Sequence, residues 1–328
     1  MSAHQPTTHP DLAQRMAYIV AQMASEEGFT ASALDNVQFM RSNHAFARAP
    51  VMYEPCICII VQGRKRAYLG EASYVYDAQQ YLVVSAPLPF EADTEATTEK
   101  PMLGITLSID QALAADLALA VDEAMHEAVH EVMNKATQQD TNAQAAIHDA
   151  PPGFMYSTRV DTALAEAVMR LLQSLASPLE AKILAPAIVR EIYFRVLMGE
   201  QGTAMRAALS QGQHFQKITR ALRIIHRDFN SKLDVNSLAR ESGMSVPAFH
   251  AHFKNVTMTT PIQYIKAMRL HKARLLMIRG GMSAFSASSS VGYESSSQFS
   301  REFKRLFGRS PLDEVQQMRS VLRLRPAA

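Results

Sequence analysis

The chain contains few cysteines and no long apolar segment. Its two cysteines, Cys56 and Cys58, are too few for a disulfide framework and do not have the spacing of a zinc site. No apolar run reaches the roughly 18 residues that a membrane-spanning helix needs. The first residues also lack the basic start and apolar block of a secretory signal. We therefore expect a cytoplasmic protein that is not embedded in a membrane.

Histidine is missing where a metal-binding barrel would need it. Residues 51–108 alternate short β-type runs with turn signals such as Gly63 and Gly70, which is typical of a small sandwich or barrel. The expected strands cover residues 57–61, 67–69, 74–76, 81–84 and 103–107. A catalytic metal in such a barrel needs a cluster of histidines on the strands, and this stretch has none. We expect no metal and no other cofactor.

One enzyme motif is present in form. His126-Glu127-Ala128-Val129-His130 matches the helical His-Glu-x-x-His motif of zinc hydrolases and places both histidines on one helix face. A third ligand is not evident, because Met133 and Ala136 stand where an extended motif would have glycine and histidine. A solvent-exposed helix face is the favoured interpretation, and a zinc hydrolase is the alternative function from the enzyme class.

Negative charge is scarce in the last third of the chain. Residues 214–328 contain 19 Lys and Arg against 7 Asp and Glu, whereas residues 1–213 contain 14 against 24. One acidic and one basic part predict two domains with different partners, and the basic part is expected to bind phosphates. Solvated basic helices would give the same balance, so charge alone does not decide the function.

The expected organisation is α+β. An N-terminal helix is predicted within residues 1–30, a sensor barrel over 31–118 and a helical connector over 119–212. Within the connector, the polar, Ala-rich residues 137–153 are expected to form a mobile loop. Residues 213–320 are helical nearly throughout and form the predicted all-α domain.

That all-α domain contains an internal repeat with an offset of 50 residues. The repeated pairs are Phe249/Phe299, Phe253/Phe303, Lys254/Lys304 and Pro261/Pro311. In each copy a glycine, Gly243 or Gly292, lies where a helix must end sharply, because glycine tolerates a positive φ. Ser245 and Ser295 follow and are expected to cap the next helix.

Each copy is interpreted as a helix-turn-helix, over about 233–256 and 283–307, with a connecting helix over 261–278. The phenylalanines bury one face of the second helix and leave the opposite face for DNA. The candidate DNA-contacting residues are Ser245, Val246, Pro247, His250, Ala251, Lys254, Ser295, Ser296, Ser297, Gln298, Arg301, Lys304 and Arg305. One copy alone could be a plain helical hairpin, but two copies in register favour sequence-specific DNA binding. A sequence-blind architectural DNA binder is the remaining alternative of this class.

The second copy resembles a known family signature. Gly292-Tyr-Glu-Ser-x-Ser-Gln-Phe-Ser-Arg-Glu-Phe-Lys-x-x-Phe-Gly-x-Ser-Pro311 is similar to the signature of the AraC/XylS regulators, and the resemblance covers about residues 213–319. Residues 53–66, 81–85 and 186–191 are similar to one N-terminal type of that family. One departure is Ser288-Ser-Ser290, because serine competes with helix hydrogen bonding and predicts a less stable helix there.

The resemblance implies a cupin-like N-terminal β-barrel before the two helix-turn-helix units. It also implies a transcription activator that is not an enzyme, with double-stranded promoter DNA, a small-molecule effector and RNA polymerase as partners. Homodimerisation is a further implication. The helical stripe Val160, Leu164, Val168, Leu171 and Leu175 is either a dimer seam or a face buried against the chain's own barrel, and the resemblance favours the seam.

The candidate effector-binding residues lie in the barrel and are Cys56, Cys58, Arg64 and Lys65. The two thiols point to the same side of a strand and are either buried small hydrophobes or a sensor of oxidants and electrophiles. Arg64-Lys65-Arg66 follows Gly63 and favours a hairpin turn over a nucleic-acid patch. Its charge could also attract an anionic effector.

Overall fold

The computed structural model describes residues 10–135, 154–202, 205–206 and 213–322. The expected mobile loop over 137–153 lies outside the described residues. Among the described residues, no helix combines the length and apolarity needed to cross a bilayer.

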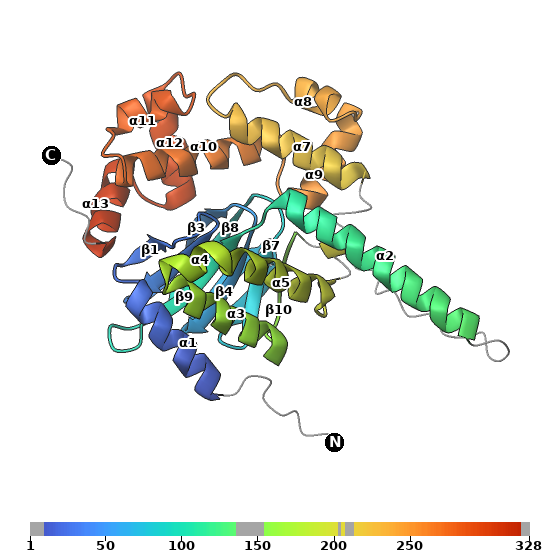
Figure 1. Cartoon of the computed structure of the whole chain (residues 1–328). Coiled ribbons are helices and arrows are strands. Elements are labelled where there is room, and N and C mark those ends of the chain that lie inside the picture. Colours follow the sequence, from blue (N-terminus) through green and yellow to red (C-terminus); the bar gives the residue numbers. More distant parts are fainter. Residues whose placement is uncertain (1–9, 136–153, 203–204, 207–212, 323–328) are drawn as a thin grey trace.

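An antiparallel sheet forms the N-terminal part of the molecule (Figure 1). Its strands are β1 (Gly28–Ala31), β2 (Val37–Ser42), β3 (Phe46–Tyr53), β4 (Cys56–Gln62), β5 (Arg64–Leu69), β6 (Ala72–Asp77), β7 (Gln80–Val84), β8 (Leu88–Glu95), β9 (Met102–Ser108) and β10 (Met155–Arg159). They lie in the order β1-β2-β9-β4-β7-β6-β5-β8-β3, and β10 pairs with β7. Because β1 and β3 are the two ends, the curled sheet is a cupin-like half-barrel and not a closed barrel. This confirms the predicted fold class.

All five expected strands are present, and five more were not expected. The missed strands include β3 and β8, which interrupt their apolar pattern with charged residues and with Pro50 and Pro89. Proline is tolerated in β3 because that strand is an edge. The sequence pattern therefore recovered the interior strands better than the edges.

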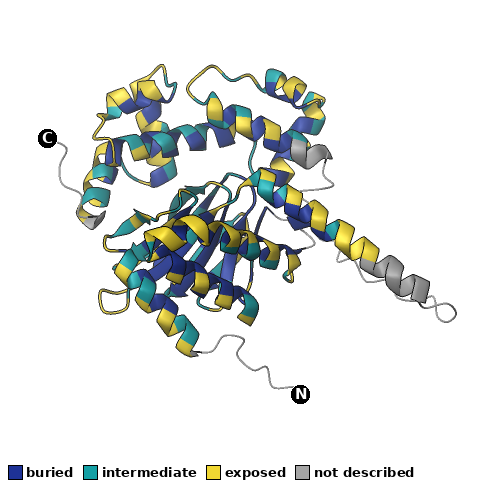
Figure 2. Ribbon diagram, viewed as in Figure 1, coloured by how far each residue is buried: buried dark blue, intermediate teal, exposed yellow. Residues whose placement is uncertain are grey.

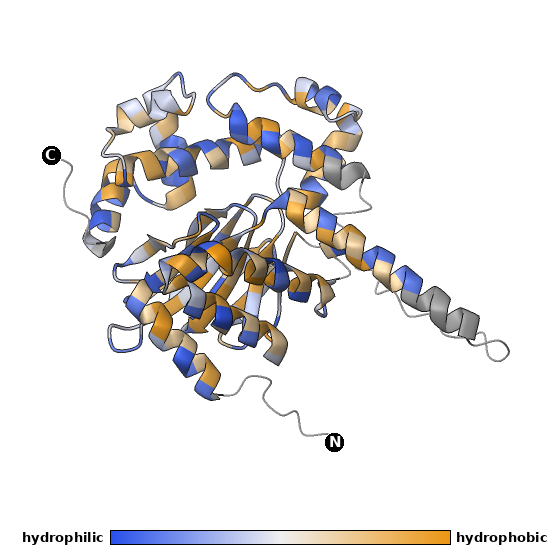
Figure 3. Cartoon of the chain, viewed as in Figure 1, coloured by the Kyte–Doolittle hydropathy of each residue, from blue (hydrophilic) through white to orange (hydrophobic). Residues whose placement is uncertain are grey.

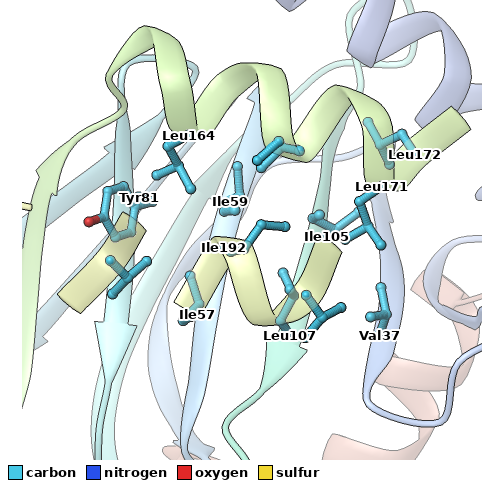
Figure 4. Packing of buried hydrophobic residues seen from close by; sticks show 14 of the residues in the cluster. Val37, Ile57, Ile59, Tyr81, Ile105, Leu107, Leu164, Leu171, Leu172 and Ile192 are labelled. Carbon is cyan, nitrogen blue, oxygen red and sulfur yellow. The ribbon is translucent and has the colours of Figure 1, made fainter. Parts of the chain in front are cut away.

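Helices cover one face of the sheet. They are α1 (Pro10–Met23), α3 (Thr162–Leu175), α4 (Pro178–Ile183) and α5 (Ala185–Met198). Figure 4 shows Leu164, Leu171 and Ile192 of α3 and α5 packed over Ile57 and Ile105 of the sheet. Helix α2 (Gln111–Lys135) instead projects away from the body, and many of its described residues are coloured as exposed in Figure 2.

The favoured interpretation of the apolar stripe as a dimer seam is wrong. Its five members, from Val160 to Leu175, are at most 3% exposed within the single chain, where they pack on the outer face of the sheet. Helical periodicity correctly identified the apolar face. It could not tell which surface covers that face.

The C-terminal part is built from seven helices, which are α7 (Gln213–Arg227), α8 (Val235–Glu241), α9 (Val246–Thr257), α10 (Pro261–Ile278), α11 (Ala284–Ser290), α12 (Ser296–Phe307) and α13 (Pro311–Leu322). Helix α10 has the predicted bounds, because Pro261 occupies its first turn and Thr260 and Gln263 form a capping box. It connects a first unit, α7–α9, to a second unit, α11–α13 (Figure 1).

The two units are buried differently. Phe253 of α9 and Tyr264 of α10 belong to one apolar cluster, which also contains Leu88 and Phe90 on the inner face of the sheet. The second unit has a cluster of its own around Phe299 and Phe303, with Leu270, Ala287 and Val291. Figure 3 shows mainly apolar residues along the central strands and alternating apolar and hydrophilic residues along the C-terminal helices. The first unit is therefore fused to the half-barrel through side-chain packing.

Candidate nucleic-acid interface

Helix α9 presents the predicted face of the first unit. Gly243 ends the preceding turn with φ +64°, and Phe249 and Phe253 are fully buried beneath α9. On the opposite side Ser245, Pro247, Ala251 and Lys254 are exposed, and Val246 and His250 are half-buried. Ser245 occupies the N-cap position, but its side chain makes no capping hydrogen bond, so the expected capping role is wrong at this residue.

Helix α12 presents a more polar face. All seven of its candidate residues are exposed, namely Ser295, Ser296, Ser297, Gln298, Arg301, Lys304 and Arg305. Ser295 caps the helix as predicted, accepting a hydrogen bond from the backbone N–H of Gln298 at 3.3 Å. Phe299 and Phe303 are fully buried beneath this face. Helices α9 and α12 therefore both combine a buried aromatic face with an accessible outer one.

The helix before α12 forms despite its serines. Ser283 caps α11, and the hydroxyl of the buried Ser288 donates to the Phe285 carbonyl oxygen at 2.8 Å. Ser290 likewise donates to the Ser286 carbonyl oxygen at 2.8 Å. The serine hydroxyls thus find partners within their own helix, although such bonds add little to helix stability.

An arginine on α10 joins the two units directly. The Arg269 guanidinium donates to the Phe229 carbonyl oxygen at 2.7 Å, to that of Ser231 at 2.6 Å and to that of Gly292 at 3.2 Å. The turn at Gly292 also lies against Asn230, because a Cβ built on this glycine would meet the Asn230 carbonyl oxygen at 2.5 Å. These contacts connect the loop before α8 with the turn before α12. This role of Arg269 could not be seen in the sequence, because its backbone partners are 23 to 40 residues away in the chain.

Arg305 lies at the border of two surfaces. Its side chain is exposed, and it also lines a cavity of about 510 Å³ between β8 and α10. Lys266, Glu302 and Phe90 line the same cavity. Arg301, by contrast, is exposed and does not line this cavity.

The structure brings together three of the four effector candidates. Cys56, Cys58 and Lys65 lie on the inner side of the half-barrel, where the Lys65 ammonium donates to the Thr94 hydroxyl at 2.8 Å. Burial lowers the pKa of Lys65. The hydrogen bond from Cys56 lowers the pKa of Cys58, and Lys65 acts in the same direction. The two buried thiols and the half-buried Lys65 ammonium thus lie on the same side of the sheet.

The other effector candidate points outward. Arg64 lies in β5 with Nε 3.2 Å from an Asp77 carboxylate oxygen and Nη1 3.8 Å from a Glu95 oxygen. Arg64, Lys65 and Arg66 therefore belong to a strand, and the expected hairpin turn is wrong. The turn is made by Gly63 alone, with φ +80°.

The His-Glu-x-x-His motif lies on the projecting helix α2. His126 and Glu127 are exposed, and the side chain of His130 lies outside the described residues. Within the part of the chain that the structure describes, no three His, Cys, Asp or Glu side chains come together as a metal site.

Two family models match the chain, one in its N-terminal part and one in its C-terminal part. The family model for the AraC-type transcriptional regulator N-terminus matches residues 33–204, and that for a helix-turn-helix domain matches residues 238–317. The solved structure of ToxT from Vibrio cholerae superposes with a TM-score of 0.56 at 11% identity, covering 85% of this chain and 93% of ToxT. At this identity the likeness to ToxT concerns the fold.

Several known transcription regulators are similar to this chain in sequence. The Msm operon regulatory protein of Streptococcus mutans is 31% identical over 29% of this chain and 34% of that protein. The regulator ArgR of Pseudomonas aeruginosa is 25% identical over 47% of each chain, and the activator RhaS of Escherichia coli is 25% identical over 47% of this chain and 55% of RhaS. These matches span about a third to just over half of each relative. Because the N-terminal family model covers more than half of the chain and a helix-turn-helix domain follows it, the chain belongs to the AraC/XylS family of transcriptional regulators.

Proposed function

We propose that the chain is a sequence-specific transcription activator that reads double-stranded promoter DNA with α9 and α12. The observation that carries this proposal is the pair of exposed reader faces, each opposite two buried phenylalanines, in two units that Arg269 connects. An α-helix with such a face fits the major groove of B-DNA. Residues 213–320 would form the DNA-binding domain.

The two reader helices would divide their contacts. On α12, Arg301 can pair with guanine O6 and N7, and Gln298 with adenine N6 and N7. Lys304 would contact a phosphate as a point charge. On α9 the smaller residues Pro247 and Ala251 suit apolar contact with bases, while the remaining candidates Ser245, Val246, His250 and Lys254 would border the backbone.

We also propose a small-molecule effector on the inner side of the half-barrel, held near Cys56, Cys58 and Lys65. Two observations support it: the half-buried ammonium of Lys65, which donates to the Thr94 hydroxyl, and the apolar cluster that this inner face shares with the first DNA-binding unit. Binding there would act on α7–α9 through direct packing. The structure of ToxT was solved with an unsaturated fatty acid bound, which supports ligand binding by this fold.

Activation, RNA polymerase contact and a homodimer complete the proposal. RhaS, one of the relatives, is an activator. A homodimer would need a surface other than the stripe on α3. Helix α4 and its C-cap residue offer exposed apolar side chains at Leu179, Ile183 and Leu184, which are 73%, 64% and 49% exposed.

Selection of binding sites by the full-length chain from randomised DNA tests the central proposal. We expect a defined motif with two conserved blocks. The affinity should also fall steeply with salt, because Lys and Arg side chains that bind phosphates release counterions from the DNA. If random DNA competes as well as the selected sequence, the chain is an architectural binder and the proposal is wrong.

A further inference from the structure

A partly buried carboxylate on α12 connects this helix with α10 and with the turn that precedes α12. Glu302 Oε1 accepts hydrogen bonds from the Lys266 ammonium of α10 at 2.7 Å and from the Gln298 side-chain amide at 3.2 Å. Its Oε2 accepts a hydrogen bond from the Tyr293 hydroxyl, in the turn before α12, at 2.8 Å. The Glu302 side chain is only 12% exposed, so its position is set by these contacts and not by solvent.

The carboxylate stays ionised in this setting. Burial opposes the charge, yet hydrogen bonds from Lys266, Tyr293 and Gln298 lower the pKa of Glu302 below its ordinary value. A carboxylate accepts hydrogen bonds only, so the amide group that contacts it must present its nitrogen and not its oxygen. The Gln298 amide therefore has one favoured orientation of its two ends.

This orientation leaves the groups needed for adenine free. A glutamine amide has two N–H hydrogens, and the bond to Glu302 uses one. The second hydrogen and Oε1 remain for adenine N7 and N6. We infer that Glu302 is a positioning residue that fixes the side-chain amide of Gln298 and thereby sets its base preference. This inference rests on the proposed base reading by Gln298.

The first unit does not contain the equivalent pair. The positions 50 residues earlier are Ala248 and His252, so no amide is available there to be oriented. A preference for adenine set in this way should therefore appear in one block of the binding site and not in its repeat. A general loss of stability would instead weaken both blocks of the binding site.

A purely structural role is the competing explanation. Glu302 also links α12 to α10 through Lys266, with both side chains partly exposed at 39% and 12%. Exchange of Lys266 for methionine breaks that link but leaves the bond between Glu302 and Gln298 in place. The variant Lys266→Met therefore separates the link between the helices from the orientation of the amide.

The test is binding-site selection by full-length variants, with melting temperatures measured in parallel. Gln298→Ala and Glu302→Ala should weaken the preference at the same single base pair, by at least about threefold, because both remove the fixed amide. Glu302→Gln retains an acceptor oxygen and should restore part of that preference. Lys266→Met should leave the motif unchanged even where it lowers the melting temperature. Glu241→Ala, which removes a negative charge from the exposed end of α8, is the matched charge control and should leave the motif unchanged.

The outcomes distinguish base reading by Gln298 from positioning by Glu302. If Gln298→Ala leaves every position of the motif unchanged, base reading by Gln298 is wrong and the inference loses its basis. If Gln298→Ala alters one position and Glu302→Ala does not, positioning by Glu302 is wrong while base reading stands. A motif change in Lys266→Met equal to that in Glu302→Ala would assign Glu302 a structural role.

Discussion

Exposed side chains of α12 differ in how directly they can reach a base. Arg301 is two residues from each of the buried rings Phe299 and Phe303, which on an α-helix places it on the side away from the core. Lys304 directly follows Phe303 and therefore lies at the edge of the buried face. Neither side chain lines the cavity that Arg305 borders. Two cations one turn apart are thus expected to have different roles.

Arg301→Ala should cost about 1–3 kcal/mol on the selected site and relax the preference at one base pair, because it removes a bidentate contact to guanine. Lys304→Ala should weaken binding to all sequences alike and reduce the salt slope by about 1, because it removes one phosphate contact. Titrations at several salt concentrations on cognate and random DNA measure both quantities. An unchanged Arg301→Ala motif would show that this arginine reads no base.

A second residue-scale prediction concerns acid stability. His271 is 6% exposed, its ring lies edge-on to Phe307 at 5.1 Å, and Nε2 has no hydrogen-bond partner among the described residues. Burial, with a smaller contribution from Arg274, lowers the pKa of His271 to about 3. Between pH 6.5 and this value the unfolded chain binds the proton and the folded chain does not. Stability should therefore fall as pH falls through that window, by up to about 1.4 kcal/mol per unit.

His271→Leu should remove this share of the acid sensitivity. Urea unfolding at pH 7 and pH 5 measures it, and the loss of free energy between the two values should be smaller in the variant than in the parent chain. His44→Gln, at an exposed position, is the control and should leave the loss as it was. An equal loss in the parent chain and in His271→Leu would contradict the assignment.

At the scale of elements, the turns decide how the helices meet. Gly292 and Gly308 both have positive φ, of +84° and +78°, and both end or precede a helix of the second unit. Only Gly292 touches another element, since its turn packs on the Asn230 backbone while a Cβ at Gly308 would meet nothing within 4 Å. Gly308 is therefore needed only for its backbone conformation, whereas Gly292 is needed for its conformation and for the close approach of Asn230.

Gly308→Ala should cost about 1–2 kcal/mol, the usual penalty of an L-residue in the left-handed region. Gly292→Ala should cost clearly more and should also weaken DNA binding, because the new methyl group displaces the loop that orients the first unit. Urea unfolding and DNA titration of the two variants measure the difference. Equal destabilisation by both would mean that the contact with Asn230 contributes nothing.

At the scale of the whole molecule, the half-barrel and the first DNA-binding unit behave as one packed body. The Tyr264 hydroxyl lies 3.0 Å from the Pro87 carbonyl oxygen and 2.7 Å from His226 Nε2. Glu54, just after β3, lies 3.4 Å from His226 Nδ1 and 3.8 Å from the Lys272 ammonium. The second unit has a separate apolar cluster and meets the half-barrel where α12 approaches β3 and β8. A change inside the half-barrel should therefore be felt first by α7–α9.

Tyr264→Phe should destabilise the full chain by about 0.5–1.5 kcal/mol, because it removes the hydrogen bond to the half-buried Pro87 carbonyl oxygen. Amide hydrogen exchange should accelerate both near residues 85–90 and in α7, since the hydroxyl bridges the two. Exchange in α12 should stay unchanged and serves as the internal control. An increase confined to α7 would mean that the two parts are not coupled at this contact.

Much of the DNA-binding part followed from the sequence alone. The repeat with its offset of 50, the glycine turns and the bounds of α10 all depend on local signals, namely helical periodicity, positive φ at glycine and proline in a first turn. Such signals act within a few residues, so a single sequence carries them. The exposed reader faces followed from the same periodicity, because burial of the phenylalanines leaves one side of each helix outside.

Only the tertiary structure decided which surfaces meet. The stripe on α3 could face a partner or the chain's own sheet, and its pattern is the same in both cases. Arg269, Glu302 and Tyr264 were indistinguishable in sequence from solvated or ordinary core residues, since apart from Gln298, four residues from Glu302, the partners that fix them lie 9 to 177 residues away in the chain. The inward and outward directions of Lys65 and Arg64 likewise depended on the pairing of β5 with β6 and β8. Local patterns determine which face of an element is apolar, but the surface that covers it is set by packing between distant segments.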